Sequence, residues 1–178
     1  MHPLRGIAQA AQAVIPSDSA IGLVQWEEHE LQRIQSDPTV PETERTAIVL
    51  ARRGQGLFKR RVMAVEHACR ITHVAREEHL RASHCKPWRD SSNEQRLDGE
   101  NGLLLTPSID HLFDRGFISF SDDGQVIVSP VAHGDSLRMM GVDPEAPPSV
   151  GAFSSVQRQY LDYHRDNVLL RSSFLERL

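Results

Sequence analysis

The chain has 178 residues, of which 39% are hydrophobic and 25% are charged, and this composition is typical of one soluble globular domain with a single core. No apolar run is long enough to span a bilayer, and glutamines interrupt any signal-peptide core near the N-terminus. Two cysteines are too few for a disulfide scaffold. These features exclude the membrane and disulfide-rich secreted classes, and they predict a cytoplasmic protein in which Cys69 and Cys85 are reduced.

The net charge of -4 would by itself argue against a nucleic-acid partner, but the charge is unevenly distributed. The stretch from Arg45 to Arg89 holds eleven Lys and Arg residues against three Glu residues. Such a local surplus of positive charge is large enough to form a phosphate-binding surface. A solvated helix face is the alternative interpretation of the same pattern.

The first part of the chain is predicted to be helical. Residues 1–44 are expected to form a helical segment or tail, with a helix over residues 21–35. The following stretch, residues 41–68, predicts two helices on either side of Gly54-Gln55-Gly56, because two glycines so close together favour a break. The second of these helices is expected over residues 57–68, with an apolar face toward the core.

Short strands are predicted in the middle of the chain. Residues 69–72 and 80–88 are rich in residues that favour strands, and Pro87 closes the second segment. Residues 89–100 are polar and form a loop long enough to be functional. Residues 101–105 then supply an apolar strand.

A helix, a hairpin and a closing helix are predicted beyond residue 105. Thr106 and Pro107 are typical of a helix start, and Gly116 is typical of a helix end. The Asp123-Gly124 pair between two alternating segments predicts a β-hairpin. The apolar spacing over residues 152–178 predicts a closing helix that packs on the core.

Polar side chains fall on consecutive pieces of the central stretch. His84 lies on a predicted strand, Asn101 begins the next one, and Asp110 and His111 lie on the first turns of the following helix. Cutting a phosphodiester requires a base that activates water and a cation that neutralises charge on the phosphate. A neutral histidine supplies the base, whereas Asp, Asn or His atoms bind a divalent ion. The spacing therefore predicts that these groups converge on one ion.

Three motifs carry a family resemblance: A-S-H-C-K-P-W over residues 82–88, R-L-D-G-E-N-G-L-L-L over 96–105 and F-D-R-G over 113–116. They resemble the HNH endonucleases of the ββα-metal fold, in particular the branch with A-x-H-x-x-P-W, R-L-D-x-x-N-G-L-L-L and F-D-R-G motifs. The resemblance extends over about residues 45–170. It implies an α+β fold in which a ββα-metal module is joined by N-terminal helices, a following β-hairpin and a C-terminal closing helix. The corresponding domain would span residues 45–178 and have its core over residues 69–130.

The resemblance also implies roles for the site residues. His84 would be the general base, Asn101 would orient the loop and the base, and a helix residue would bind the metal. Asp110 stands where the helix histidine often lies, and His111 remains the alternative, both as ligand and as catalytic residue. Asp114, one turn later, is a further candidate ligand. Many related sites have an aspartate where this chain has Ser83.

We therefore predict a metal-dependent DNA endonuclease of restriction or defence type. The cofactor is predicted to be one divalent ion, Mg²⁺, with Mn²⁺, Ni²⁺ and Zn²⁺ as alternatives. The predicted partner is double-stranded DNA. No association with a membrane is predicted, and a homodimer is compatible with the sequence. The alternative function is a DNA-binding module that does not cleave, the remnant of a larger restriction or defence protein; a purely structural metal-binding domain is a third. The predicted DNA-binding residues are Arg52, Arg53, Gln55, Lys59, Arg60, Lys86, Arg89 and Arg96.

Overall fold

The computed structural model describes residues 41–171 and, before them, residues 25, 28, 29, 32, 33, 35, 36, 38 and 39. The chain divides into two compact units, Met1–Arg45 and Thr46–Leu178. In the first unit, the described positions between 25 and 36 are helical. The remainder of the predicted segment 1–44, including most of the predicted helix 21–35, lies outside the described residues.

A single helix, α2 (Glu42–Met63), leads into the strands. It runs unbroken through Gly54 and Gly56, so the predicted division into two helices is wrong, and the helix also ends before the predicted residue 68. Each interior glycine costs a helix about 1 kcal/mol relative to alanine. Burial of Phe58 and Val62 on one side of α2 offsets that cost, because tertiary packing contributes more to helix stability than propensity does.

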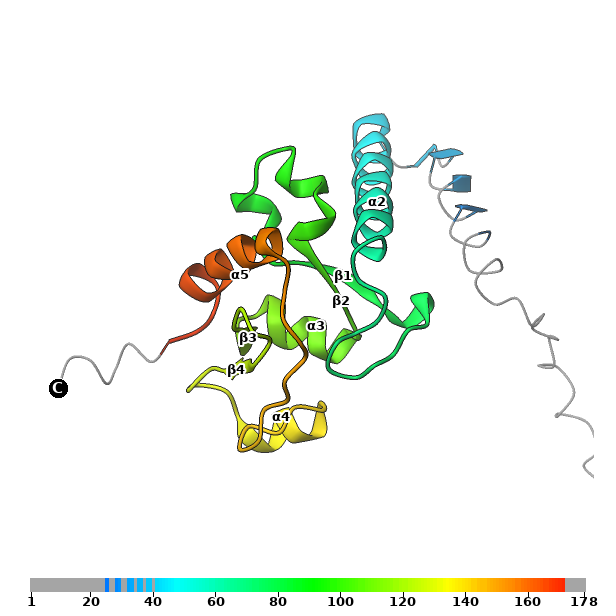
Figure 1. The fold of residues 1–178 in the computed structure, drawn as a ribbon. Helices are drawn as coiled ribbons and strands as arrows, with labels where there is room; N and C mark the ends of the chain where they lie inside the picture. The colour runs from blue at the N-terminus through cyan, green and yellow to red at the C-terminus, as the bar shows by residue number, and fades with distance from the viewer. Residues whose placement is uncertain are drawn as a thin grey trace, which may run out of the picture. The chain divides into compact units, whose positions relative to one another are not determined.

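The central module is a pair of antiparallel strands with a helix packed on it. Strands β1 (Arg81–His84) and β2 (Gly102–Leu105) pair so that His84 lies opposite Gly102. Helix α3 (Pro107–Asp114) packs on both strands (Figure 1). The predicted strand over residues 80–88 is thus confirmed only for its first half, because the chain turns after Cys85. The α+β fold with a ββα module is confirmed.

The predicted strand over residues 69–72 is wrong. The Cys69 N–H donates to the carbonyl of Val74, and the His73 N–H donates to the carbonyl of Cys69. These two local bonds close a tight turn, which uses the backbone groups that a strand would offer to a neighbour.

Short 3₁₀ helices fill the connections around β1. They are η1 (Glu77–His79) before the strand and η2 (Trp88–Asp90), η3 (Gln95–Leu97) and η4 (Gly99–Asn101) between β1 and β2. The predicted polar loop of residues 89–100 is therefore an ordered series of short helical turns.

The start of α3 follows the prediction in position but not in bonding. Thr106 occupies the N-cap and Pro107 the first helical position. The Thr106 side chain makes no capping bond, and its buried hydroxyl has no hydrogen-bond partner among the described residues.

The rest of the chain closes over the module. Strands β3 (Ile118–Phe120) and β4 (Val126–Val128) form the predicted hairpin, in which Gly124 has a φ of 91° that favours glycine. Helix α4 (Gly134–Met139) follows. Helix α5 (Ser155–Asn167) begins at a capping box formed by Ser154 and Gln157, and it packs on β3 and η4. The predicted hairpin is confirmed, and the closing helix predicted over residues 152–178 is confirmed over Ser155–Asn167; residues 168–171 are not helical, and residues 172–178 lie outside the described part of the chain.

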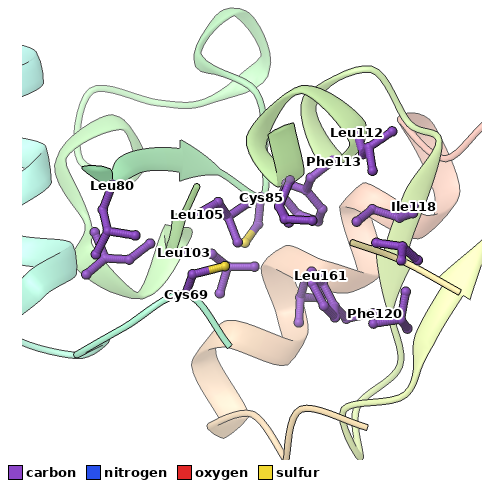
Figure 2. Packing of buried hydrophobic residues seen from close by; sticks show 14 of the residues in the cluster. Cys69, Leu80, Cys85, Leu103, Leu105, Leu112, Phe113, Ile118, Phe120 and Leu161 are labelled. Carbon is purple, nitrogen blue, oxygen red and sulfur yellow. The ribbon is translucent and has the colours of Figure 1, made fainter. Parts of the chain in front are cut away.

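One hydrophobic core joins these elements, and Figure 2 shows part of it, with the sulfur atoms of Cys69 and Cys85 inside the cluster. Both cysteines are buried and free, as predicted. Burial raises the pKa of the Cys85 thiol far above its ordinary value, and the nearby negative charge of Glu66 adds to this effect. Cys85 is therefore a protonated, unreactive core residue.

Among the described residues, no helix combines the length and the apolar character needed to cross a membrane.

Candidate active site

His84 lies at the end of β1, where several aromatic rings and a loop carbonyl surround it. Its ring is stacked on that of Phe58, with ring centroids 3.7 Å apart and planes inclined by 5°. The Trp88 ring meets it edge-on at 5.8 Å. Its Nε2 atom lies 3.0 Å from the carbonyl oxygen of Arg96. Burial lowers the pKa of His84, while the Arg96 carbonyl and the charge of Asp114 act in the opposite direction.

Asn101 holds together the turns between the two strands. Its side chain is fully buried, its Oδ1 accepts from the Lys86 N–H at 2.8 Å, and its Nδ2 donates to the Gln95 carbonyl at 2.9 Å. Nδ2 also lies 3.3 Å from the Lys86 carbonyl. Because Gln95 precedes Arg96, these bonds fix the backbone that contacts His84. Asn101 thus orients the loop from within rather than facing outward toward a ligand.

Helix α3 carries the acidic candidates on the side that faces β1. Asp110 forms an ion pair with Arg81, in which Oδ2 of Asp110 lies 3.3 Å from Nη1 of Arg81. The Asp110 side chain is 17% exposed. Asp114, one turn later on the same face, is exposed, and its charge reaches His84. Asp110 is thus paired with the first residue of β1, and Asp114 is the acid whose charge acts on His84 at the end of that strand.

His111 is oriented differently from its two acidic neighbours. It is exposed, and its ring lies 6.2 Å from the ring of Phe117, which follows the helix. Ser83, where the resemblance leads to an aspartate, is buried. Neither residue adds a described contact to the Asp110 and Asp114 pair.

The donor set at α3 suits one kind of metal ion. Within the described part of the chain, no three His, Cys, Asp or Glu side chains gather closely enough to hold an ion. Structural zinc sites require such a protein cage, whereas Mg²⁺ keeps several waters and is held by one or two carboxylates together with substrate phosphates. Asp110 and Asp114 fit the second description. The guanidinium of Arg81 contacts the Asp110 carboxylate.

Three of the predicted DNA-binding cations bond to the segments that flank β1. Lys59 donates to the Glu77 carbonyl, Lys86 donates to Gln95 Oε1, and Arg96 donates to the Trp88 carbonyl. The Arg96 guanidinium also lies over the Trp88 ring, 5.0 Å from its centroid.

The remaining predicted DNA contacts lie on α2 and η2. Gln55 and Arg60 are exposed on α2, and the Arg89 side chain is 82% exposed. Arg52 and Arg53 belong to α2, but their side chains lie outside the described part of the structure.

Three further residues of the site were not assigned to it from the sequence. Phe58 was expected only on an apolar helix face, and Arg81 was expected only in the basic stretch. Trp88 is 47% exposed beside His84. The P-W pair marks its position in the sequence, but only the turn after Cys85 decides that the ring faces solvent.

The comparison with protein families agrees with this geometry. Residues 69–121 match the family model described as HNH endonuclease. This segment is therefore similar to HNH endonuclease domains. The matched segment covers the β1–β2 pair, the turns between these strands, α3 and β3. It begins after the end of α2. A comparison with curated proteins found no match.

The HNH match confirms the predicted resemblance and implies a phosphodiester hydrolase. HNH nucleases act on DNA, and the family typically uses a divalent metal ion. The roles of individual residues in this domain stay predictions.

Proposed function

We propose that the protein is a metal-dependent endonuclease that hydrolyses phosphodiester bonds of DNA, with His84 as the general base. The observation that carries this proposal is the 3.0 Å contact between His84 Nε2 and the Arg96 carbonyl. A carbonyl oxygen only accepts, so Nε2 bears the ring proton. Nδ1 is then the nitrogen that can take a proton from water.

In the proposed reaction, His84 Nδ1 removes a proton from a water molecule as the water oxygen bonds to phosphorus. The bond between phosphorus and one sugar oxygen breaks, and the strand is nicked. Asn101 acts indirectly, because it fixes the loop whose Arg96 carbonyl contacts the His84 ring. The low pKa that burial imposes keeps His84 neutral, which is the form able to accept the proton.

Asp110 and Asp114 would hold the metal ion in this proposal, and His111 is the alternative to Asp110. A divalent ion bound there would supply positive charge for the phosphate. Mg²⁺ suits a pair of carboxylates better than Ni²⁺ or Zn²⁺ does, and Mn²⁺ is a suitable substitute.

The proposed DNA-binding surface combines α2 and η2. Gln55, Arg60 and Arg89 are exposed there, and Arg52 and Arg53 lie on the same helix. Lys59, Lys86 and Arg96 are proposed to act mainly by holding the loops that border the site.

Cleavage of supercoiled plasmid with Mg²⁺ or Mn²⁺ tests the proposal. We expect the wild type to nick the plasmid and His84→Ala to be slower by about 10²- to 10⁴-fold, the usual contribution of a general base. His111→Ala, a matched histidine removal on the same module, tests the alternative catalytic residue. Equal nicking by the wild type and His84→Ala would overturn the role of His84. No nicking by the wild type with any divalent ion, together with salt-dependent DNA binding, would favour the non-cleaving module.

The biological setting is also a proposal. Restriction or defence in the cytoplasm, acting on double-stranded DNA, is the role that the branch motifs suggest. A single HNH site nicks one strand, so a double-strand break would need two copies of the domain. Phage plating on cells that express the wild type or His84→Ala tests the role, and light scattering of the purified protein tests for a homodimer. Equal plating on both strains would contradict a defence role.

A further inference from the structure

Helix α2 reaches the candidate base from outside the matched segment. Phe58 is 2% exposed, and its ring faces the imidazole of His84 at a centroid distance of 3.7 Å with nearly parallel planes. Neither the family match, which begins at residue 69, nor the motifs around His84 assign any function to this helix.

Two glycines allow α2 to come this close. Gly102 lies opposite His84 in the strand pair, and a Cβ atom there would lie 2.3 Å from Val62 Cγ2 and 2.7 Å from Phe58 Cζ. A Cβ atom at Gly99 would lie 2.4 Å from the Arg61 carbonyl oxygen. All three distances are far below van der Waals contact, so only residues without a side chain permit this packing.

A hydrogen bond joins the same helix to the loop that contacts His84. Arg61 Nη1 donates to the Leu97 carbonyl at 2.9 Å, one residue after the Arg96 carbonyl that binds His84 Nε2. The loop and Phe58 are therefore positioned by adjacent turns of one helix.

We propose that Phe58 is a positioning residue for the general base: its ring covers one face of the His84 imidazole and, together with the Arg96 carbonyl, fixes the direction of Nδ1. The hydrogen bond at Nε2 restrains rotation of the ring within its plane, and the stack restrains its tilt. This inference rests on the proposed nuclease function, and it makes α2 part of the active unit.

Three variants separate positioning from core packing. Phe58→Leu removes the aromatic face, and Phe58→Tyr keeps it. Phe120→Leu makes the same large-to-small change at a fully buried phenylalanine that contacts Phe113 and Phe153 instead of His84. All three are assayed at a temperature at which circular dichroism shows each to be folded.

Plasmid cleavage by Phe58→Leu should have a kcat roughly tenfold to a hundredfold below the wild type with an unchanged KM, because small displacements of a catalytic group cost this much. Phe58→Tyr should recover most of that loss, and Phe120→Leu should retain the wild-type kcat. Wild-type kcat in folded Phe58→Leu would overturn the proposal, as would an equal loss in Phe120→Leu.

Nuclear magnetic resonance of the His84 ring gives a readout that does not depend on cleavage. The face of Phe58 should shift the imidazole carbon-bound protons of His84 upfield, and this shift should disappear in Phe58→Leu and persist in Phe58→Tyr and Phe120→Leu. Absence of the shift in the wild type would overturn the stack itself. A wild type that shows the shift but does not cleave would instead overturn the nuclease function, and with it the role of the stack in catalysis.

Discussion

Asn101 shows how one side chain organises the loop beside His84. Its amide makes bonds to the backbone of Lys86 and Gln95, and it lies 3.5 Å from the hydroxyl of Ser91. All of these partners lie between β1 and β2, so the residue acts as a buried cross-link of the loop rather than as a surface ligand.

Replacing Asn101 with alanine should therefore destabilise the whole domain. The Lys86 N–H and the Gln95 carbonyl would each lose a buried partner, and an unsatisfied buried group costs about 1 to 3 kcal/mol. We expect the free energy of unfolding to fall by about 3 kcal/mol in urea titrations. Asn93→Ala, on the same loop but exposed, should change it by less than about 0.5 kcal/mol. Equal effects of the two variants would contradict the cross-linking role.

In the proposed site, Arg81 would compete with a metal ion for Asp110. The pair is 3.3 Å apart, and the Arg81 side chain is 64% exposed, so its attraction is weakened by solvent. Arg81→Gln should tighten Mn²⁺ binding about twofold to fivefold in calorimetric titrations of the protein without DNA, since it frees a carboxylate and removes a positive charge.

Three control variants accompany that titration. Asp110→Asn should weaken Mn²⁺ binding if Asp110 is the ligand, whereas His111→Gln should weaken it if the alternative holds. Arg138→Gln removes an exposed arginine of α4 and should leave binding unchanged. Unaltered binding in Arg81→Gln would show that the ion does not use Asp110 as a ligand.

Among the elements, a largely buried ion pair in the segment after α2 connects that segment to α5. Glu66 is 3% exposed and receives two bonds from the Arg70 guanidinium, at 2.8 and 2.6 Å. Gln157 of α5 donates to the same carboxylate at 2.8 Å. Arg70 also lies over the Phe153 ring, 4.3 Å from its centroid. Segments far apart in the chain thus meet at one carboxylate.

Glu66→Ala should lower the free energy of unfolding by about 3 to 5 kcal/mol, because it leaves the largely buried charge of Arg70 without its partner. Asp135→Ala removes an acid from the exposed pair with Arg138 on α4 and should cost no more than about 1 kcal/mol. Thermal unfolding monitored by circular dichroism would rank the two variants. A similar loss in both would mean that the Glu66 carboxylate is solvated rather than buried.

Within the HNH-containing unit as a whole, His164 connects α3, β3 and α5. It is 1% exposed, its ring stacks on Phe113 at 3.8 Å, and its Nε2 lies 3.0 Å from the Phe113 carbonyl. Its Nδ1 lies 2.9 Å from the Ser119 hydroxyl. Both ring nitrogens are therefore satisfied in the neutral form. Burial lowers the pKa of His164 to about 4.

Domain stability should depend on pH through this histidine. Between pH 6.5 and about 4 the unfolded chain binds a proton at His164 that the folded protein does not, so the free energy of unfolding falls as the pH falls through this range. The full stability is present above about pH 6.5, and the loss from this group approaches about 3 kcal/mol near pH 4. Urea titrations at pH 7 and pH 5 would measure it.

Two histidine variants identify the group responsible. His164→Gln should be less stable than the wild type at pH 7 but lose less between pH 7 and pH 5. His67→Gln, at an exposed position, should keep the wild-type dependence on pH. A dependence on pH that is unchanged in His164→Gln would assign the effect to another group.

Much of the fold could be predicted from local patterns. The alternation of apolar and polar residues around the Asp123-Gly124 turn was sufficient to predict the hairpin. The apolar Leu103–Leu105 run was sufficient to predict β2. Both signals depend on interactions between neighbours in the chain. The break expected at Gly54 and the strand expected at residues 69–72 were wrong. In both cases non-local packing or a specific turn outweighed a weak local preference.

The family resemblance, the order of elements after residue 80 and the identity of the polar candidate residues follow from motifs and short-range periodicity, so they could be predicted before folding was considered. The contacts that each residue makes became known only from the folded structure. It placed Phe58 against His84, Arg81 against Asp110 and the amide of Asn101 inside the loop. These contacts include that of Lys86 with Asn101, 15 positions apart, and that of Arg81 with Asp110, 29 positions apart. They depend on how α2, the strands and α3 pack, and no local pattern encodes that arrangement.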